Sequence, residues 1–326
     1  MSLLRIRQLS AHEIGHTIGL AHNYISSAER AAGNQSVMEY PHPRTTVNPD
    51  GTINVDEAYD RGIGRWDEIA IMYGYSDFPD GTDEAAALEA ILQEGIAEGT
   101  TFRPNQGVHP QTGVWDNGDN LATELNRMMD VRRIALDRFG EATIRNGEPI
   151  ATMEDVFVPL YLHHRYQVES TVNILGGQYY TFAMRGDGQT PMRRASAAEQ
   201  QQALDALLRT LEPAELAVPE AVRENLPPRP GGFGGGNELF GGWTGPTFDP
   251  IAPAATAASV TLSQILNPSR AARLVQQKAL DPSLPGLDDV LGSLSDAVVI
   301  AGGEGGPYLD EIKRTVVNVY VDELMD

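Results

Sequence analysis

Apolar residues recur at the spacing of α-helices along most of the chain. In the first such segment, residues 3–21, they lie around much of the cylinder, at Leu4, Leu9, Ile14 and Ile18 among others. A helix with this pattern is expected to be covered on several sides.

The rest of the chain is also predicted to be mostly helical. One broad apolar face runs through residues 121–139. A second face runs from Thr152 to Leu175, with a kink expected near Pro159 because proline lacks the N–H that a helix needs. Ser196 and Glu199 form a capping-box pattern, which predicts a helix start. Other helices are expected over 66–75, 83–98, 213–225, 256–279, 285–300 and 308–324.

Two segments depart from the helical pattern. Residues 178–185 (QYYTFAMR) are the clearest strand candidate and are expected to pair in a small hairpin or at a sheet edge. Residues 225–253 are rich in glycine and proline but also carry aromatic residues, namely Phe233, Phe240, Trp243 and Phe248. We expect a long surface loop that inserts some of these as anchors; the alternative is a disordered loop. The expected fold is therefore mainly α, with at most a small β element.

Composition argues against several classes of function. The chain has 326 residues and a formal net charge of −21, so its average surface repels a phosphate backbone and nucleic acid is not an expected partner. It contains no cysteine, so any metal must be held by His, Asp or Glu. No stretch approaches the roughly 18 consecutive apolar residues of a membrane helix, and the N-terminus lacks a signal-peptide core.

The opening segment carries one concentrated motif, SAHEIGHTIGLAHN, at residues 10–23. His12 and His16 are four residues apart, so on a helix their imidazoles leave the same face and can chelate one ion. Gly19 allows the helix to stop and the chain to turn, and His22 then offers a third nitrogen. Three neutral imidazoles leave the fourth position of tetrahedral Zn²⁺ open, as a catalytic site requires.

Glu13 stands next to the first histidine, where its carboxylate can reach an activated water without binding the metal. It is the candidate general base, and later the acid that returns the proton to a leaving amine. Any single histidine would more commonly be a hydrogen-bonded core residue. The complete pattern is far more specific than a bare H-E-x-x-H, so it predicts a zinc site and metal-assisted hydrolysis.

The pattern H-E-x-x-H-x-x-G-x-x-H followed by a methionine turn resembles that of the metzincin zinc peptidases. SVMEY, residues 36–40, is similar to the second half of that signature, so the resemblance implies that Met38 lies in a tight turn beneath the ligands. It also implies that Tyr40 contacts zinc or the oxyanion formed during cleavage; the alternative is a tyrosine packed under the turn. Further blocks, among them WDEIAIMYGY, WDNGDN and GGQYYTFAMRGDG, resemble a group of large bacterial zinc-dependent metalloproteases.

This resemblance implies two domains and a missing part. Residues 1–100 would hold the zinc helix, the methionine turn and the C-terminal subdomain of a metzincin catalytic domain, and residues 101–326 would form an α-helical domain. A metzincin places a sheet and a backing helix before the zinc helix. We therefore expect a C-terminal fragment whose partner is the missing N-terminal half of the catalytic domain. An uncovered first helix would also allow a homodimer.

The sequence thus predicts a zinc-dependent endopeptidase acting on protein or peptide substrates, although the isolated chain is expected to turn over little. Its ligands would be His12, His16 and His22, with Glu13 as base and acid. Two alternatives stay open: a non-catalytic binding or structural module that retains the motif, and a metal-dependent hydrolase of another amide. An exported location, periplasmic or extracellular, is implied by the family resemblance alone.

Other polar groups are weaker candidates. His42 lies in a proline-flanked loop and is expected to be exposed rather than functional. His164 falls on an apolar stripe, where a hydrogen-bonded structural histidine is expected rather than a second metal site. In WDNGDN, Asp116, Asp119 and the asparagines, among them Asn120, offer oxygen ligands of the kind that calcium takes. Their spacing does not match an EF-hand loop, so a turn and helix cap is expected instead.

Overall fold

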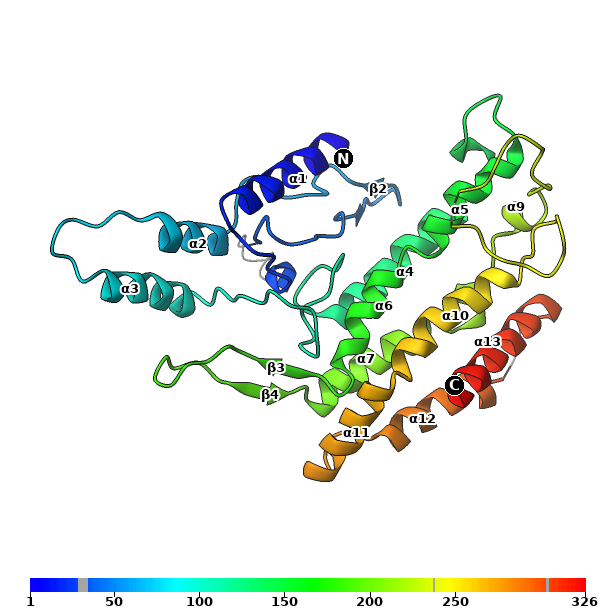
Figure 1. Cartoon of the computed structure of the whole chain (residues 1–326). Coiled ribbons are helices and arrows are strands. Elements are labelled where there is room, and N and C mark those ends of the chain that lie inside the picture. The colour runs from blue at the N-terminus through cyan, green and yellow to red at the C-terminus, as the bar shows by residue number, and fades with distance from the viewer. Residues whose placement is uncertain (29–34, 237, 303–304) are drawn as a thin grey trace. The chain divides into compact units, whose positions relative to one another are not determined.

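The computed structural model describes residues 1–28, 35–236, 238–302 and 305–326 (Figure 1). It is mainly helical, with two short antiparallel two-stranded sheets, which confirms the predicted fold class. The chain divides into two compact units, one formed by Met1–Glu124 with Gly177–Ala195 and the other by Leu125–Gly176 with Ser196–Asp326. The predicted domain boundary after residue 100 was drawn from the family resemblance and stays a prediction. Among the described residues, no helix is long and apolar enough to span a membrane.

The described residues of the first unit form three complete α-helices and two hairpins. Its elements are α1 (Ser2–Thr17), β1 (Thr46–Val47) paired with β2 (Ile53–Asn54), α2 (Arg65–Tyr75), α3 (Glu84–Ala97), and β3 (Gln178–Tyr180) paired with β4 (Met192–Arg194). Arg65 at the start of α2 forms ion pairs with Glu94 of α3 and with Glu98, the residue that follows α3. The end of α1 shares a small hydrophobic cluster with α2, to which Met38 and Trp66 belong.

The second unit is a helical assembly. Its elements are α4 (Leu121–Asp137, which begins in the first unit), α5 (Met153–Tyr161), α6 (Arg165–Thr171), α7 (Ala197–Arg209), α8 (Pro213–Leu216), α9 (Glu220–Arg223), α10 (Ala252–Ile265), α11 (Pro268–Leu280), α12 (Leu287–Ser295) and α13 (Pro307–Met325), with a π-helical turn at Asp296–Ile300 and 3₁₀ turns at Glu141–Thr143, Ile150–Thr152 and Val172–Ile174. Helix α10 lies along α13 and also packs against α6 (Figure 1). Leu262, Ile312 and Val316 are at most 2% exposed, so this helix pair forms part of a dry core.

Prolines divide two of the predicted helices. The segment predicted as one helix over 256–279 forms α10 and α11, because Pro268 has no N–H to continue α10. The Asn267 side chain instead accepts hydrogen bonds from the backbone N–H groups of Ser269 and Arg270 and starts a new helix. In the same way, Pro219 separates α8 from α9 within the single helix predicted over 213–225.

The other departures from the predicted elements are also local. The helix expected from Thr152 to Leu175 tolerates Pro159 inside α5 and breaks instead at a turn over 162–164. The strand expected over 178–185 is paired only at its first three residues, opposite β4.

The loop over 225–253 inserts only some of its aromatic residues. Phe240 lies with its ring 5.5 Å from that of Tyr161 and 6.0 Å from that of Phe157, and Phe248 also reaches Phe157 at 6.0 Å. Trp243 is 98% exposed and Phe233 is 49% exposed, so only part of the aromatic set is inserted. Residue 237 of this loop lies outside the described residues.

Candidate metal centre

Helix α1 ends in a turn that brings the following residues back towards its own histidines. Gly19 has φ +87°, a conformation that side chains with a Cβ rarely adopt. Its N–H donates to the carbonyl of His16 at 3.0 Å, and the N–H of Leu20 donates to the carbonyl of Gly15 at 3.0 Å. This paired pattern is a Schellman turn, which satisfies the last carbonyls of the helix while reversing the chain. The predicted role of Gly19 in ending the helix is thereby explained.

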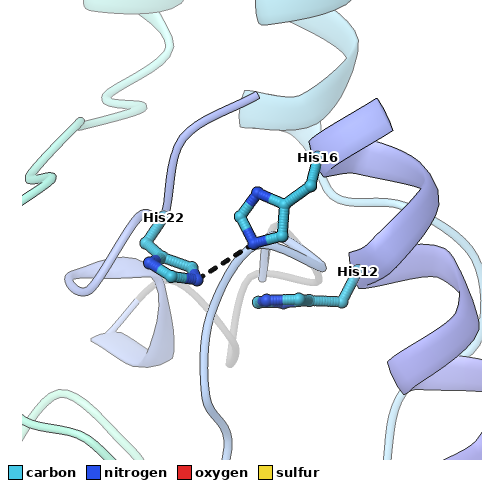
Figure 2. Close-up of side chains that lie close together, drawn as sticks. All are labelled: His12, His16 and His22. Carbon is cyan, nitrogen blue, oxygen red and sulfur yellow. Dashed lines mark hydrogen bonds between the residues drawn. The ribbon is translucent and has the colours of Figure 1, made fainter. Parts of the chain in front are cut away.

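The three histidines of the motif meet beside this turn (Figure 2). His12 and His16 project from α1, His22 approaches from the segment after the turn, and one ring nitrogen from each lies within 4.8 Å of the others. His16 Nε2 and His22 Nε2 are 3.1 Å apart. His12 is only 2% exposed, while His22 is partly open. No other group of three possible metal-ligating side chains was found among the described residues.

Backbone carbonyls orient the two histidines of the helix. His12 Nδ1 lies 2.8 Å from the carbonyl oxygen of Val37, and His16 Nδ1 lies 2.9 Å from that of Leu20. A ring nitrogen that faces a carbonyl oxygen must carry the hydrogen, so in the neutral rings Nε2 keeps its lone pair for a metal. His22 Nδ1 lies 3.3 Å from the hydroxyl of Tyr24, a partner that the motif does not reveal.

This arrangement fits Zn²⁺. Two nitrogens bound to zinc at about 2.0–2.1 Å in tetrahedral geometry stand roughly 3.3 Å apart. The 3.1 Å between His16 Nε2 and His22 Nε2 is close to that spacing. Lone pairs so close repel each other unless a proton or a cation lies between them. The three side chains therefore need little movement to hold a metal.

Burial and neighbouring side chains favour the neutral form of His22. Its pKa is lowered mainly by burial, and the neighbouring His12 and His16 act in the same direction, while the carboxylate of Glu13 opposes them. Metal binding requires an unprotonated imidazole nitrogen. Glu13 itself is exposed on α1, directly after His12, and is therefore accessible to a reacting molecule.

Met38 lies in a turn against α1, as the resemblance implied. Its side chain is fully buried, and its carbonyl accepts a hydrogen bond from the N–H of Asn23 at 3.0 Å. A Cβ on Gly15 would overlap the Met38 sulfur, so the glycine inside HEIGH allows the close approach of helix and turn. Because Val37 of the same turn contacts His12, this packing also positions a ligand.

Replacing Gly15 by alanine is expected to displace Met38 and to destabilise the first unit. Overpacking of a buried site costs about 1–3 kcal/mol, which exceeds the helix-propensity gain of about 1 kcal/mol from removing a glycine. Zinc affinity should fall about tenfold or more, since disturbed outer contacts typically cost 10–100-fold. Chelator competition and urea unfolding measure the two effects.

Gly74→Ala in α2 is the matched control, because a Cβ there meets no atom within 4 Å. It should leave zinc affinity unchanged and leave stability equal or slightly higher. Equal zinc affinity and stability in Gly15→Ala and the native chain would show that the turn does not depend on this contact.

Two buried carboxylates, Asp67 and Glu39, accept hydrogen bonds from the methionine turn. The sequence analysis identified neither of them. Asp67 of α2 is fully buried and accepts hydrogen bonds from the Ser36 hydroxyl at 2.5 Å and the Val37 N–H at 2.9 Å. Glu39 is also fully buried and accepts from the N–H groups of Ser27 and Tyr40. Burial raises the pKa of Asp67 and raises that of Glu39 well above its usual range, the latter helped by Asp116. The only indication in the sequence was that Glu39 is the one charged residue in the segment SVMEY.

Tyr40 belongs to the same cluster as the histidines. Its hydroxyl lies 2.8 Å from His22 Nε2, and its ring centroid is 4.7 Å from that of His22 and 5.1 Å from that of His12. Its carbonyl accepts a hydrogen bond from the N–H of Trp115, which has φ +62°, unusual for a residue other than glycine. The phenol therefore faces the ring nitrogen of a candidate ligand, His22. Its role in chemistry stays a prediction.

The other polar residues considered in the sequence lie in environments that favour structural roles. The expected exposure of His42 is wrong: it is 4% exposed, and its Nδ1 lies 3.2 Å from the carbonyl of Pro43, because the loop folds inward beside Trp115 and Asp116. His164 is 1% exposed, and burial lowers its pKa well below the usual value. In WDNGDN, the Asn120 side chain accepts a hydrogen bond from the N–H of Thr123 and caps α4, as predicted.

Fold and site together define a class of protein, a mainly helical metalloprotein of metzincin type. Three histidines from one helix and its glycine turn lie over a buried methionine turn. The family described as Met-zincin matches residues 1–303, so the chain belongs to that family. Membership implies zinc as the metal. Comparison with curated proteins and with solved structures found no match.

Proposed function

We propose that the chain carries the metal centre of a zinc-dependent endopeptidase. The observation that supports this most directly is the convergence of His12, His16 and His22 on one point, with ring tautomers suited to a metal. Glu13 and Tyr40 add a carboxylate beside the site and a phenol within it. A purely structural zinc site would be closed by a fourth protein ligand, whereas this set has three histidines.

The residues divide the chemistry of peptide hydrolysis among themselves. When held by the three histidines, zinc supplies Lewis-acid polarisation of the scissile carbonyl and of the attacking water. Glu13 accepts the proton of that water and then donates it to the amine that leaves. The phenol of Tyr40 donates a hydrogen bond to the oxygen on which negative charge develops. Met38 and Gly19 support this set by fixing the turn and the helix end.

The exposed face of α1 supports the proposal that another polypeptide segment completes the catalytic domain. Leu3, Ile6 and Ile14 are 73%, 58% and 61% exposed, an unusual exposure for large apolar residues on one helix. We propose that an N-terminal half of a metzincin catalytic domain is the natural cover, with a homodimer as the alternative. Turnover by the chain alone is accordingly expected to be slow. Export stays a prediction that rests on the family resemblance.

Zinc content and chelator-sensitive cleavage test the proposed function. We expect about one zinc per chain by elemental analysis after dialysis, and slow cleavage of a quenched fluorescent peptide library that a chelator stops and added zinc restores. His16→Ala should lower zinc affinity by about 100-fold or more, since loss of a ligand exceeds the 10–100-fold cost of losing an outer contact. His163→Ala, a histidine of the second unit, serves as control. Equal zinc in the native chain and in His16→Ala would contradict the assigned ligands.

A further inference from the structure

The first unit contains a polar cavity that does not include the histidine triad. Its volume is about 470 Å³, and its lining comes from Ile25 and Ala28, from the segment over 99–111 and from the β3–β4 hairpin. The polar residues that line it include Arg103, His109, Arg193, Thr101, Thr181 and Thr190. Every one of these side chains can donate a hydrogen bond, and three of them are basic residue types.

Arg103 is the central group of this cavity. It is only 3% exposed, and its guanidinium donates to the carbonyl oxygens of Phe102 and Tyr180. The buried Nε has no hydrogen-bond partner. Among the described residues, no carboxylate is shown in an ion pair with Arg103; burial lowers its pKa, and the phenol of Tyr180 opposes that shift. A buried cation with donors to spare is costly unless an anion binds to it.

His109 and Arg193 extend the positive and donor character of the cavity. His109 is 4% exposed, and its pKa is lowered to about 4, mainly by burial and further by Arg103 and Arg193. Its Nδ1 accepts a hydrogen bond from the N–H of Gln111 at 3.2 Å, so the neutral ring presents Nε2 as a donor. The Arg193 guanidinium lies 3.5 Å from the centroid of the Tyr179 ring. In a chain of net charge −21, the two guanidiniums of Arg103 and Arg193 beside the neutral His109 donor favour an anionic ligand.

Backbone contacts tie this cavity to the metal centre. The N–H of Tyr24 donates to the carbonyl of Arg103 at 2.9 Å, and the N–H of Arg103 donates to the Asn23 side chain at 2.9 Å. Ile25, which lines the cavity, follows His22 by only three residues. Three residues span at most about 11 Å even when fully extended, a distance that a short stretch of bound peptide can bridge.

We propose that this cavity is a subsite that binds a carboxylate of a peptide, supplied by an acidic side chain or by the C-terminus. The inference that the ligand is a peptide rests on the proposed function. The inference that a carboxylate is bound rests on the hydrogen-bond donors of the cavity, since a guanidinium pairs with a carboxylate through two parallel N–H donors. The Thr190 hydroxyl, which also lines the cavity, can donate to a remaining carboxylate lone pair.

Peptide binding to the zinc-loaded chain with Glu13→Ala, which prevents cleavage, tests the subsite. The probes are four dansyl-labelled peptides of six residues. Each consists of alanines with either one glutamate or one glutamine, and each of these two sequences is made with a free and with an amidated C-terminus. We expect neutralising one carboxylate to weaken binding about 10- to 100-fold, the range for a charge-assisted hydrogen bond. Loss with glutamine identifies a side-chain carboxylate, and loss with the amide identifies the terminal one. Equal affinity of all four peptides, or equal competition by inorganic phosphate and acetate without peptide preference, would overturn the proposal.

Two variants and one control locate the binding. Arg103→Gln should remove the preference for the carboxylate peptide, but its buried backbone contacts make it sensitive to misfolding. Arg193→Gln is therefore the second variant, since this residue is exposed. Arg194→Gln is the control, because successive residues of β4 point to opposite faces and Arg194 does not line the cavity. An equal effect of Arg193→Gln and Arg194→Gln would contradict the assignment. Carboxylate binding without any peptide cleavage would refute only the proposed function.

Discussion

Alanine at Glu13 is expected to lower kcat/KM for peptide cleavage by about 10²–10⁴-fold, the usual contribution of a general acid–base group. Zinc content should stay at the level of the native chain, because the three ligands are histidines and Glu13 is exposed beside them. The physical reason is that the attacking water keeps its proton when no carboxylate stands ready to accept it. A hydrophobic replacement at this position leaves the helix intact, since alanine is the best helix former.

The measurement combines zinc analysis with cleavage of quenched fluorescent peptides over long incubations, because slow turnover is expected. Glu57→Ala, another exposed glutamate of the same unit, is the control and should leave both quantities unchanged. Unchanged cleavage in Glu13→Ala would contradict its role as base. Loss of zinc in that variant would instead make the carboxylate part of the metal site.

Two other outcomes distinguish the alternative functions. Suppose that the native chain binds zinc but cleaves no peptide, even when the proposed N-terminal half of the catalytic domain is added. That result would favour a binding or structural module. Cleavage of other amides but not of peptides would favour a different amide hydrolase. Both tests depend on the same histidine triad, so zinc content has to be established first.

The candidate ligands could be predicted from sequence because their geometry is local. His12 and His16 are one helical turn apart, and Gly19 reverses the chain within three residues, so the motif alone determines which side chains meet. The supports of the site could not be predicted in this way. Asp67 reaches Val37 across 30 residues, and such contacts depend on how helices pack rather than on spacing.

The difference between local patterns and long-range packing also explains which helix boundaries and which loop anchors could be predicted. Apolar periodicity predicts that 256–279 is helical, but the break at Asn267 depends on a side-chain cap that competes with helix continuation. Phe240 and Phe248 pack against Phe157, whereas Trp243 stays exposed, although composition alone makes the loop aromatics equivalent. Which of them becomes an anchor depends on the surface that the loop crosses.

A buried arginine in the second unit provides a test of the helical assembly itself. Arg132 of α4 is 1% exposed; its Nε donates to the carbonyl of Tyr161 at 2.6 Å and its Nη1 to that of Glu215 at 2.9 Å. Tyr161 is the last residue of α5, where carbonyls lack helical partners. The guanidinium also lies 4.5 Å from the centroid of the Tyr161 ring. Arg132 thus replaces the missing backbone donors at the end of α5 and joins three segments.

Arg132→Ala is therefore expected to destabilise the second unit by about 3–5 kcal/mol, since it removes a charged donor from the carbonyls of two buried residues, Tyr161 and Glu215, and opens a cavity. Urea unfolding followed by circular dichroism measures the loss. Arg133→Ala is the matched control: its side chain is 54% exposed and pairs with Asp130 at the surface, so it should change stability by less than about 1 kcal/mol.

Arg132→Met separates the charge of Arg132 from its hydrogen bonds. Methionine restores most of the side-chain volume and removes the cost of burying a cation, but it supplies no donor to Tyr161 or Glu215. If the lost hydrogen bonds to the carbonyls account for most of the destabilisation, this variant should have a stability close to that of Arg132→Ala. If the buried charge is itself the main cost, Arg132→Met should approach the native chain. Equal stability of Arg132→Ala and Arg133→Ala would show that α5 does not depend on this cap.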